Sequence, residues 1–91
     1  MTPTLKKRFV LRHPAGLHAR PVTNLVKIAN AFDAKLQLIC KDEAVDLKSI
    51  MGVLSLGVPA GTEVFIKASG HDAEAALAKI TDFFNQLQTT K

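Results

Sequence analysis

The sequence has 91 residues, of which 47% are hydrophobic, and its only aromatic side chains are five Phe. A chain of this length has room for one small core, so we expect a single domain over residues 1–91. Twelve Lys and Arg against eight Asp and Glu give a net charge of +4. This balance excludes an acidic tail and suits partners with negative surfaces, but is too mild to indicate nucleic-acid binding. The single cysteine, Cys40, excludes an internal disulfide and suits a reducing compartment.

The N-terminus lacks the apolar segment of an export signal, because Leu5 is followed directly by Lys6, Lys7 and Arg8. The longest uncharged stretch, residues 49–62, is interrupted by glycines and a proline and falls short of the roughly 20 apolar residues of a membrane span. We therefore expect a cytoplasmic protein that does not contact a membrane.

The first half of the chain predicts a strand, a loop and a helix. Apolar and charged residues largely alternate over residues 5–12, which is typical of a half-buried strand. After the loop at residues 13–16, the apolar positions of residues 19–32 fall on one helical face. Pro21 is tolerated only in the first helical turn, which places the start of this helix at about His18.

The second half predicts three strands and two helices. Alternation indicates strands around Leu36–Cys40, Val45–Leu47 and residues 63–68. Ser49 is a good N-cap for a short helix ending near Gly57, and Asp72 is expected to cap a final helix over residues 73–87.

The element order is therefore β-α-β-β-α-β-α. We expect a two-layer α+β domain with the helices on one side of the sheet. The short connection between the second and third strands requires an antiparallel pair, which excludes an all-parallel sheet.

The segment at residues 16–21 places a histidine at a helix start. Unpaired N–H groups there bind anions, and the helix field disfavours a protonated imidazole. Arg20 can hold phosphoryl oxygens with its planar guanidinium, and Gly16 permits a sharp turn. This arrangement indicates a phosphoryl acceptor, with His18 as nucleophile and Ala19 and Arg20 as candidate phosphate-binding residues. On spacing alone, a solvated histidine that merely caps the helix is the favoured explanation, because isolated features of this kind are common.

The short helix predicted after Ser49 carries more apolar residues than one buried face needs. The surplus predicts an exposed docking patch, for which flexible Met51 is well suited. A phosphate on Ser49 would lie at the start of this helix, beside the patch. A capping serine on a fully packed helix is the alternative.

Other candidate sites are weaker. His13 and His71 are interpreted as exposed loop residues, and no cluster with metal-ligand spacing is evident, so no metal or cofactor is expected. Cys40 is expected to be a small core residue. The basic run at residues 6–8 favours a solvated strand edge over a nucleic-acid site, since only Phe9 lies nearby in the sequence.

Two motifs together resemble the HPr family, the histidine-containing phosphocarriers of the bacterial phosphoenolpyruvate:sugar phosphotransferase system. Gly16-Leu17-His18-Ala19-Arg20-Pro21 resembles the active-site signature, and residues 47–57, LKSIMGVLSLG, resemble the regulatory-serine signature. The resemblance implies an open-faced sandwich of a four-stranded antiparallel sheet and three helices, in agreement with the element order.

The resemblance also implies roles and partners. His18 would accept a phosphoryl group on Nδ1 from Enzyme I and pass it to the IIA domains of sugar permeases, while Arg20 positions it. Ser49 would be modified by an HPr kinase/phosphorylase, and a catabolite regulator is a further possible partner. The candidate partner-binding residues are Ile50, Met51, Leu54, Leu56, Lys27 and Lys48. The protein is then a monomeric carrier rather than an enzyme.

Three positions depart from the family pattern. Ala15 and Val22 replace the residues usual there, and His13 adds an imidazole, so transfer rate and partner preference are open. The alternatives are a nitrogen-branch or purely regulatory homologue and a basic nucleic-acid module. Regulatory paralogues lack the acceptor histidine, which this chain keeps, and a nucleic-acid module leaves both motifs unexplained. The sequence does not identify the sugars transported.

Overall fold

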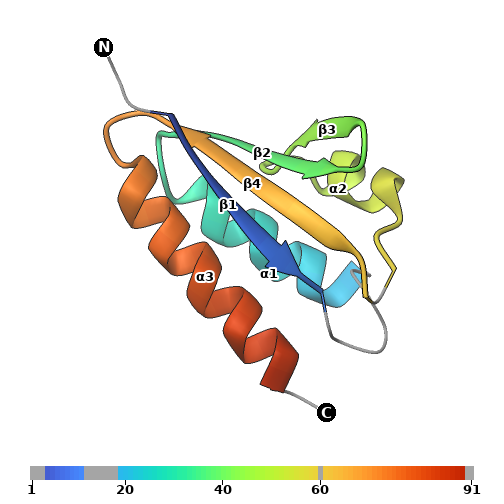
Figure 1. Ribbon diagram of the computed structural model, residues 1–91. Coiled ribbons are helices and arrows are strands. Elements are labelled where there is room, and N and C mark those ends of the chain that lie inside the picture. The colour runs from blue at the N-terminus through green and yellow to red at the C-terminus, as the bar shows by residue number, and fades with distance from the viewer. Residues whose placement is uncertain (1–3, 12–18, 60, 90–91) are drawn as a thin grey trace.

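The computed structural model describes residues 4–11, 19–59 and 61–89. In chain order the elements are β1 (Thr4–Val10), α1 (Ala19–Asn30), β2 (Lys35–Cys40), β3 (Glu43–Asp46), α2 (Ile50–Leu56), β4 (Glu63–Ser69) and α3 (Ala73–Thr89). The four strands form one sheet in the order β1-β4-β2-β3, and every neighbouring pair is antiparallel. The expected α+β architecture is confirmed, with the helices on one side of the sheet (Figure 1).

The core lies between the sheet and the helices. Alternate strand residues face it, as in the row Leu36, Ala68 and Leu5 that crosses β2, β4 and β1. Helix α3 contributes Phe84, whose ring stacks on Phe9 of β1 with centroids 4.6 Å apart. Cys40 is buried in this core, as predicted.

Several element boundaries differ from the sequence prediction: β1 already ends at Val10, α3 continues to Thr89, and the ends of α1 and β3 also lie elsewhere than expected. Helix α1 ends at Asn30 rather than Phe32 because the next two N–H groups, of Ala31 and Phe32, donate to carbonyl oxygens three residues back instead of four, those of Ile28 (3.1 Å) and Ala29 (3.3 Å). Strand β3 ends at Asp46, before Leu47, which was expected to belong to it. Leu47 is nevertheless buried, and its N–H donates to the Leu36 carbonyl oxygen (3.0 Å).

Gly70 connects β4 to α3 at a point where the chain passes close to another loop. Its φ is +139°, and a Cβ built there would lie 2.9 Å from the Ala34 Cα. Both the backbone conformation and the lack of space therefore require glycine at this position. Among the described residues, no helix is both long enough and apolar enough to cross a membrane.

Candidate functional site

Helix α1 begins immediately after the candidate nucleophile. His18 itself lies outside the described residues, as do His13 and Ala15, and the side chains of Ala19 and Arg20 are not described either. Ala19 and Arg20 are the first two residues of the helix and Pro21 is the third, so the prediction of Pro21 in the first turn is confirmed. The first turn contains no acidic residue, so no side chain of the turn itself offsets the positive end of the helix dipole.

Buried side chains fix the start of α1 on the core. Pro21 is buried, and Val22 and Leu25 are completely inaccessible to solvent. Val22, which departs from the family pattern, therefore fills the space between the helix and the sheet rather than facing solvent. Because closely packed side chains resist displacement, these contacts hold the first turn in a fixed position.

Ser49 caps α2 as the sequence predicts. It has extended backbone angles (φ −111°, ψ 116°), and its Oγ accepts a hydrogen bond from the Gly52 N–H at 3.1 Å. Gly57 ends the helix in the left-handed conformation and donates its N–H to the Leu54 carbonyl oxygen. Both helix ends are thus defined by local interactions.

Helix α2 has an exposed apolar surface, which we call the α2 patch and define as Ile50, Met51, Leu54 and Leu56. Ile50 is 40% exposed and Met51 is 78% exposed, whereas Leu54 and Leu56 are partly buried. Val53 is the helix residue that is buried, at 1% exposure. The prediction that α2 carries more apolar residues than the core accepts is confirmed.

The two lysines expected beside this patch occupy different environments. Lys48 is half-buried and its Nζ donates to the Phe32 carbonyl oxygen at 2.7 Å, so its charge stabilises the chain just after α1. Lys27 is exposed on α1, where it lines a groove with Lys79 and Phe83 of α3. Lys48 directly precedes Ser49, the cap of α2, while Lys27 lines the groove between α1 and α3.

Hydrogen bonds join the end of β1 to the segment that follows α2. Leu11, the last described residue before α1, donates its N–H to the Thr62 carbonyl oxygen at 3.0 Å and accepts from the Gly61 N–H. Gly61 and Thr62 belong to the connection between α2 and β4. The chain leading to His18 consequently starts beside the segment that follows α2 (Figure 1).

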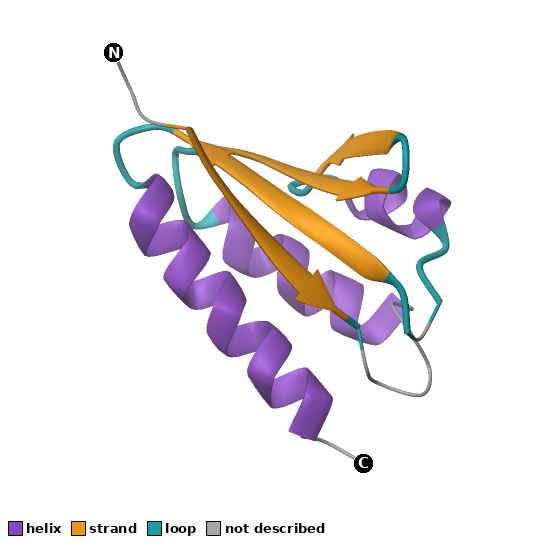
Figure 2. Cartoon of the chain, in the orientation of Figure 1, coloured by secondary structure: helices purple, strands orange, loops and turns teal. Residues whose placement is uncertain are grey.

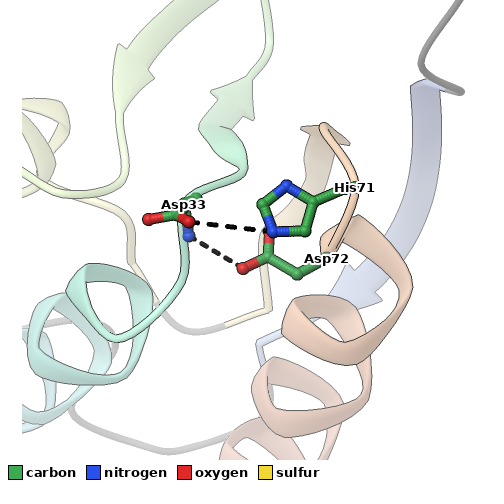
Figure 3. A group of neighbouring side chains, drawn as sticks. All are labelled: Asp33, His71 and Asp72. Atoms are coloured by element: carbon green, nitrogen blue, oxygen red, sulfur yellow. Dashed lines mark hydrogen bonds and ion pairs between the residues drawn. The ribbon is translucent and has the colours of Figure 1, made fainter.

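A cluster of Asp33, His71 and Asp72 was not anticipated (Figure 3). Their ligand-type atoms lie within 4.8 Å of one another, which corrects the expectation that no such cluster exists. The Asp72 oxygens accept hydrogen bonds from the backbone N–H groups of Asp33 and Ala34, both at 2.8 Å, and His71 Nε2 lies 3.7 Å from Asp33 Oδ2. Asp72 precedes α3 as predicted, but its carboxylate binds the loop between α1 and β2.

The hydrogen bond from the Asp33 N–H is the main cause that lowers the pKa of Asp72, and it outweighs the opposing effect of desolvation. The Ala34 N–H and the neighbouring His71 lower it further. Because both oxygens already have donors, we interpret the cluster as a connection between two loops rather than a metal site. The sequence signal for it is Asp72 itself, although its residue type and position predict a cap for the helix that follows.

The comparisons with known proteins agree with the two motifs. The family model for the PTS HPr component phosphorylation site matches residues 5–86. HPr from Bacillus anthracis is 34% identical, with a TM-score of 0.84 over 89% of this chain and 96% of that one. HPr from Thermoanaerobacter tengcongensis is 31% identical, with a TM-score of 0.90 over 96% and 98%. Crh, the catabolite-repression protein of Bacillus subtilis, described as a swapped dimer, is 38% identical, with a TM-score of 0.73 over 88% and 92%.

The family model covers most of the chain, and solved HPr structures that are more than 30% identical share its fold. The chain therefore belongs to the HPr family, the phosphocarrier component of the phosphotransferase system.

Proposed function

We propose that this protein carries phosphoryl groups on His18, accepting them from Enzyme I and delivering them to the IIA domains of sugar permeases. The observation that carries the proposal is the start of α1 at Ala19, directly after His18, in a chain that matches the family's phosphorylation-site model. As a carrier, the protein is a covalent participant in transfer and not a catalyst in its own right. We place it in the cytoplasm, as a monomer, without a cofactor.

The transfer follows from nucleophilic chemistry at a helix start. The unprotonated Nδ1 of His18 attacks phosphorus, the bond to the donor group breaks, and the donor keeps that electron pair. The N–H groups of Ala19 and Arg20 belong to the first helical turn and have no partner within the helix, while Pro21 contributes none. These N–H groups and the Arg20 guanidinium would stabilise the phosphoryl oxygens, with support from the positive end of the helix dipole, which no acidic residue of the first turn offsets.

The α2 patch is the proposed docking surface for Enzyme I and the IIA domains. Ile50 and Met51 are the large apolar side chains that the described part of the chain leaves exposed. A carrier must release each partner after transfer, which suits a small apolar contact with a polar surround. Lys27 is proposed to attract acidic partners by long-range electrostatics, and Lys48 to border the contact through its stem.

Ser49 is the proposed regulatory phosphorylation site, modified by an HPr kinase/phosphorylase where the host has one. Its hydroxyl lies next to Ile50 and Met51 in the sequence and caps their helix. A phosphate would favour the start of α2 but place negative charge beside the α2 patch, so an acidic partner would be repelled. A catabolite regulator that recognises the modified form would gain a charged contact at the same place.

A regulatory role without phosphoryl transfer is the second candidate, favoured by the 38% identity to Crh. The two candidates differ in the chemistry of His18. Intact mass is measured after incubation with phosphoenolpyruvate and Enzyme I, with His18→Ala as the control. One acid-labile phosphoryl group, absent without Enzyme I and absent in the variant, supports the carrier. A folded protein that gains no phosphate from several Enzyme I homologues supports the regulator.

A further inference from the structure

The face of the sheet opposite the helices is not covered by any described element (Figure 2). In each strand the residues that alternate with the core-facing ones point to this face, and the antiparallel register places them in rows. We call this surface the open face. Its side chains play no part in the proposed phosphoryl transfer, since the helices α1 and α2 lie on the other side of the sheet (Figure 1).

An apolar row crosses the middle of the open face. Phe65 of β4 pairs with Ile39 of β2, and Ala44 of β3 continues the row beyond Ile39. Phe65 and Ile39 are half-buried and Ala44 is exposed, so this row offers apolar contact area to a partner. At its β1 end the row finishes with Arg8, which forms an ion pair with Glu63. The charge of Arg8 at that end of the open face is therefore neutralised by Glu63.

Three lysines lie on the side of the apolar row that is away from Glu63. We call Lys6, Lys35 and Lys67 the lysine cluster. Lys6 and Lys67 are directly opposite each other on β1 and β4, and Lys35 is on β2 one row further along. All three are exposed, and the described part of the chain provides no ion pair to any of them. Like charges directly opposite on neighbouring strands repel each other, which applies to Lys6 and Lys67 in the protein alone.

We propose that the open face docks an acidic segment of a protein partner. Its carboxylates would bind the lysine cluster and an apolar side chain would cover Phe65 and Ile39. Apolar contact at the centre with charged groups around it is the usual composition of a specific protein interface. A single-stranded nucleic acid is a poorer match, because successive bases stack on several aromatic rings and Phe65 is the one aromatic residue on the described part of the open face.

This docking is independent of the phosphoryl-transfer proposal. The occupied surface is formed by β1, β4 and β2, while the α2 patch and the start of α1 belong to the helical layer. A partner on the open face would consequently leave both motifs accessible. The protein could then bind the acidic partner and exchange phosphoryl groups at the same time.

The test uses a short fluorescein-labelled peptide rich in Glu with two leucines, titrated into the full chain at low ionic strength. Lys67→Glu is compared with the matched control Lys79→Glu, which makes the same charge change on the exposed surface of α3. We expect Lys67→Glu to weaken binding about ten-fold and Lys79→Glu less than about two-fold. Amide shifts on peptide addition should fall in β1, β4 and β2.

Four outcomes would overturn the proposal. The first two are that the peptide does not bind at millimolar concentration, and that both variants weaken its binding equally. The third is that the amide shifts are confined to α1 and α2. The fourth is that a single-stranded oligonucleotide or an anionic phospholipid vesicle binds more tightly than the peptide at the same salt concentration. Circular dichroism of Lys67→Glu confirms that the variant is folded before the affinities are compared.

Discussion

Replacing Gly70 with alanine should destabilise the protein far more than the same change at Gly57. At Gly70 the added Cβ would lie 2.9 Å from Ala34 Cα and 3.3 Å from Ala34 Cβ, and φ is +139°. The backbone strain costs about 1–3 kcal/mol and the overlap with Ala34 about 1–3 kcal/mol more. Moving Ala34 would also weaken the hydrogen bond from its N–H to Asp72. We therefore expect Gly70→Ala to lower the free energy of unfolding by about 4 kcal/mol.

Gly57→Ala is the matched control, because Gly57 has φ +58° but no atom within 4 Å of the added Cβ. It should cost only the left-handed backbone penalty of about 1 kcal/mol. For a domain of this size each kcal/mol corresponds to about 4–8 °C in Tm, so the two variants should be well separated. Urea unfolding is followed by circular dichroism, since the chain has no Trp or Tyr for fluorescence. Equal destabilisation by the two variants would refute the argument that Ala34 blocks the site.

Three further predictions concern the helix starts and the docking residues. Ser49→Ala should lower the free energy of unfolding, measured in urea, by about 1 kcal/mol, because the hydrogen bond from the Gly52 N–H to the capping side chain is lost. Ser49→Asp should keep this cap but slow phosphoryl transfer from Enzyme I, measured in a transfer assay. Because the pKa of Asp72 is lowered in the folded state, its stabilising contribution is present above the ordinary value of 3.8 and disappears as pH falls through the folded pKa. Asp72→Asn should therefore flatten the acid limb of a Tm-against-pH curve, and an unchanged limb would contradict this. Lys27→Glu should slow phosphoryl transfer at low ionic strength and much less at high salt, and equal slowing in stopped-flow assays at both salts would exclude electrostatic attraction.

Features that depend on neighbours in the sequence were predictable. Ser49 and Gly57 define α2 through contacts within a few residues, so residue type and spacing were sufficient. The exposure of Met51 followed from counting, because a short helix presents one face to a core and this one carries a surplus of apolar residues. The start of α1 followed from Pro21, which lacks an N–H and is confined to the first turn.

Features that depend on long-range pairing were not predictable. Asp72 has the residue type and position of a helix cap, yet its carboxylate binds the N–H groups of Asp33 and Ala34, almost 40 residues earlier in the chain. The sequence around Lys6 offered only Phe9 as an aromatic neighbour, whereas the sheet register brings Phe65 beside it. Propensity and periodicity carry no information on which strand will lie next to which.

The strand order has a consequence for folding. Strands β1 and β2 both pair with β4, which is the last strand to be synthesised, and β1 has no other partner among the described strands. Until Glu63–Ser69 is available, β1 has no ladder to join and β2 can form only a hairpin with β3. Native pairing of β1 with β4 must therefore close a long loop. This slows folding compared with a protein whose contacts are mostly local, and it leaves few stable partly folded states. We expect fragments that stop before β4 to lack the four-stranded sheet, because β4 is the inner strand that joins β1 to β2.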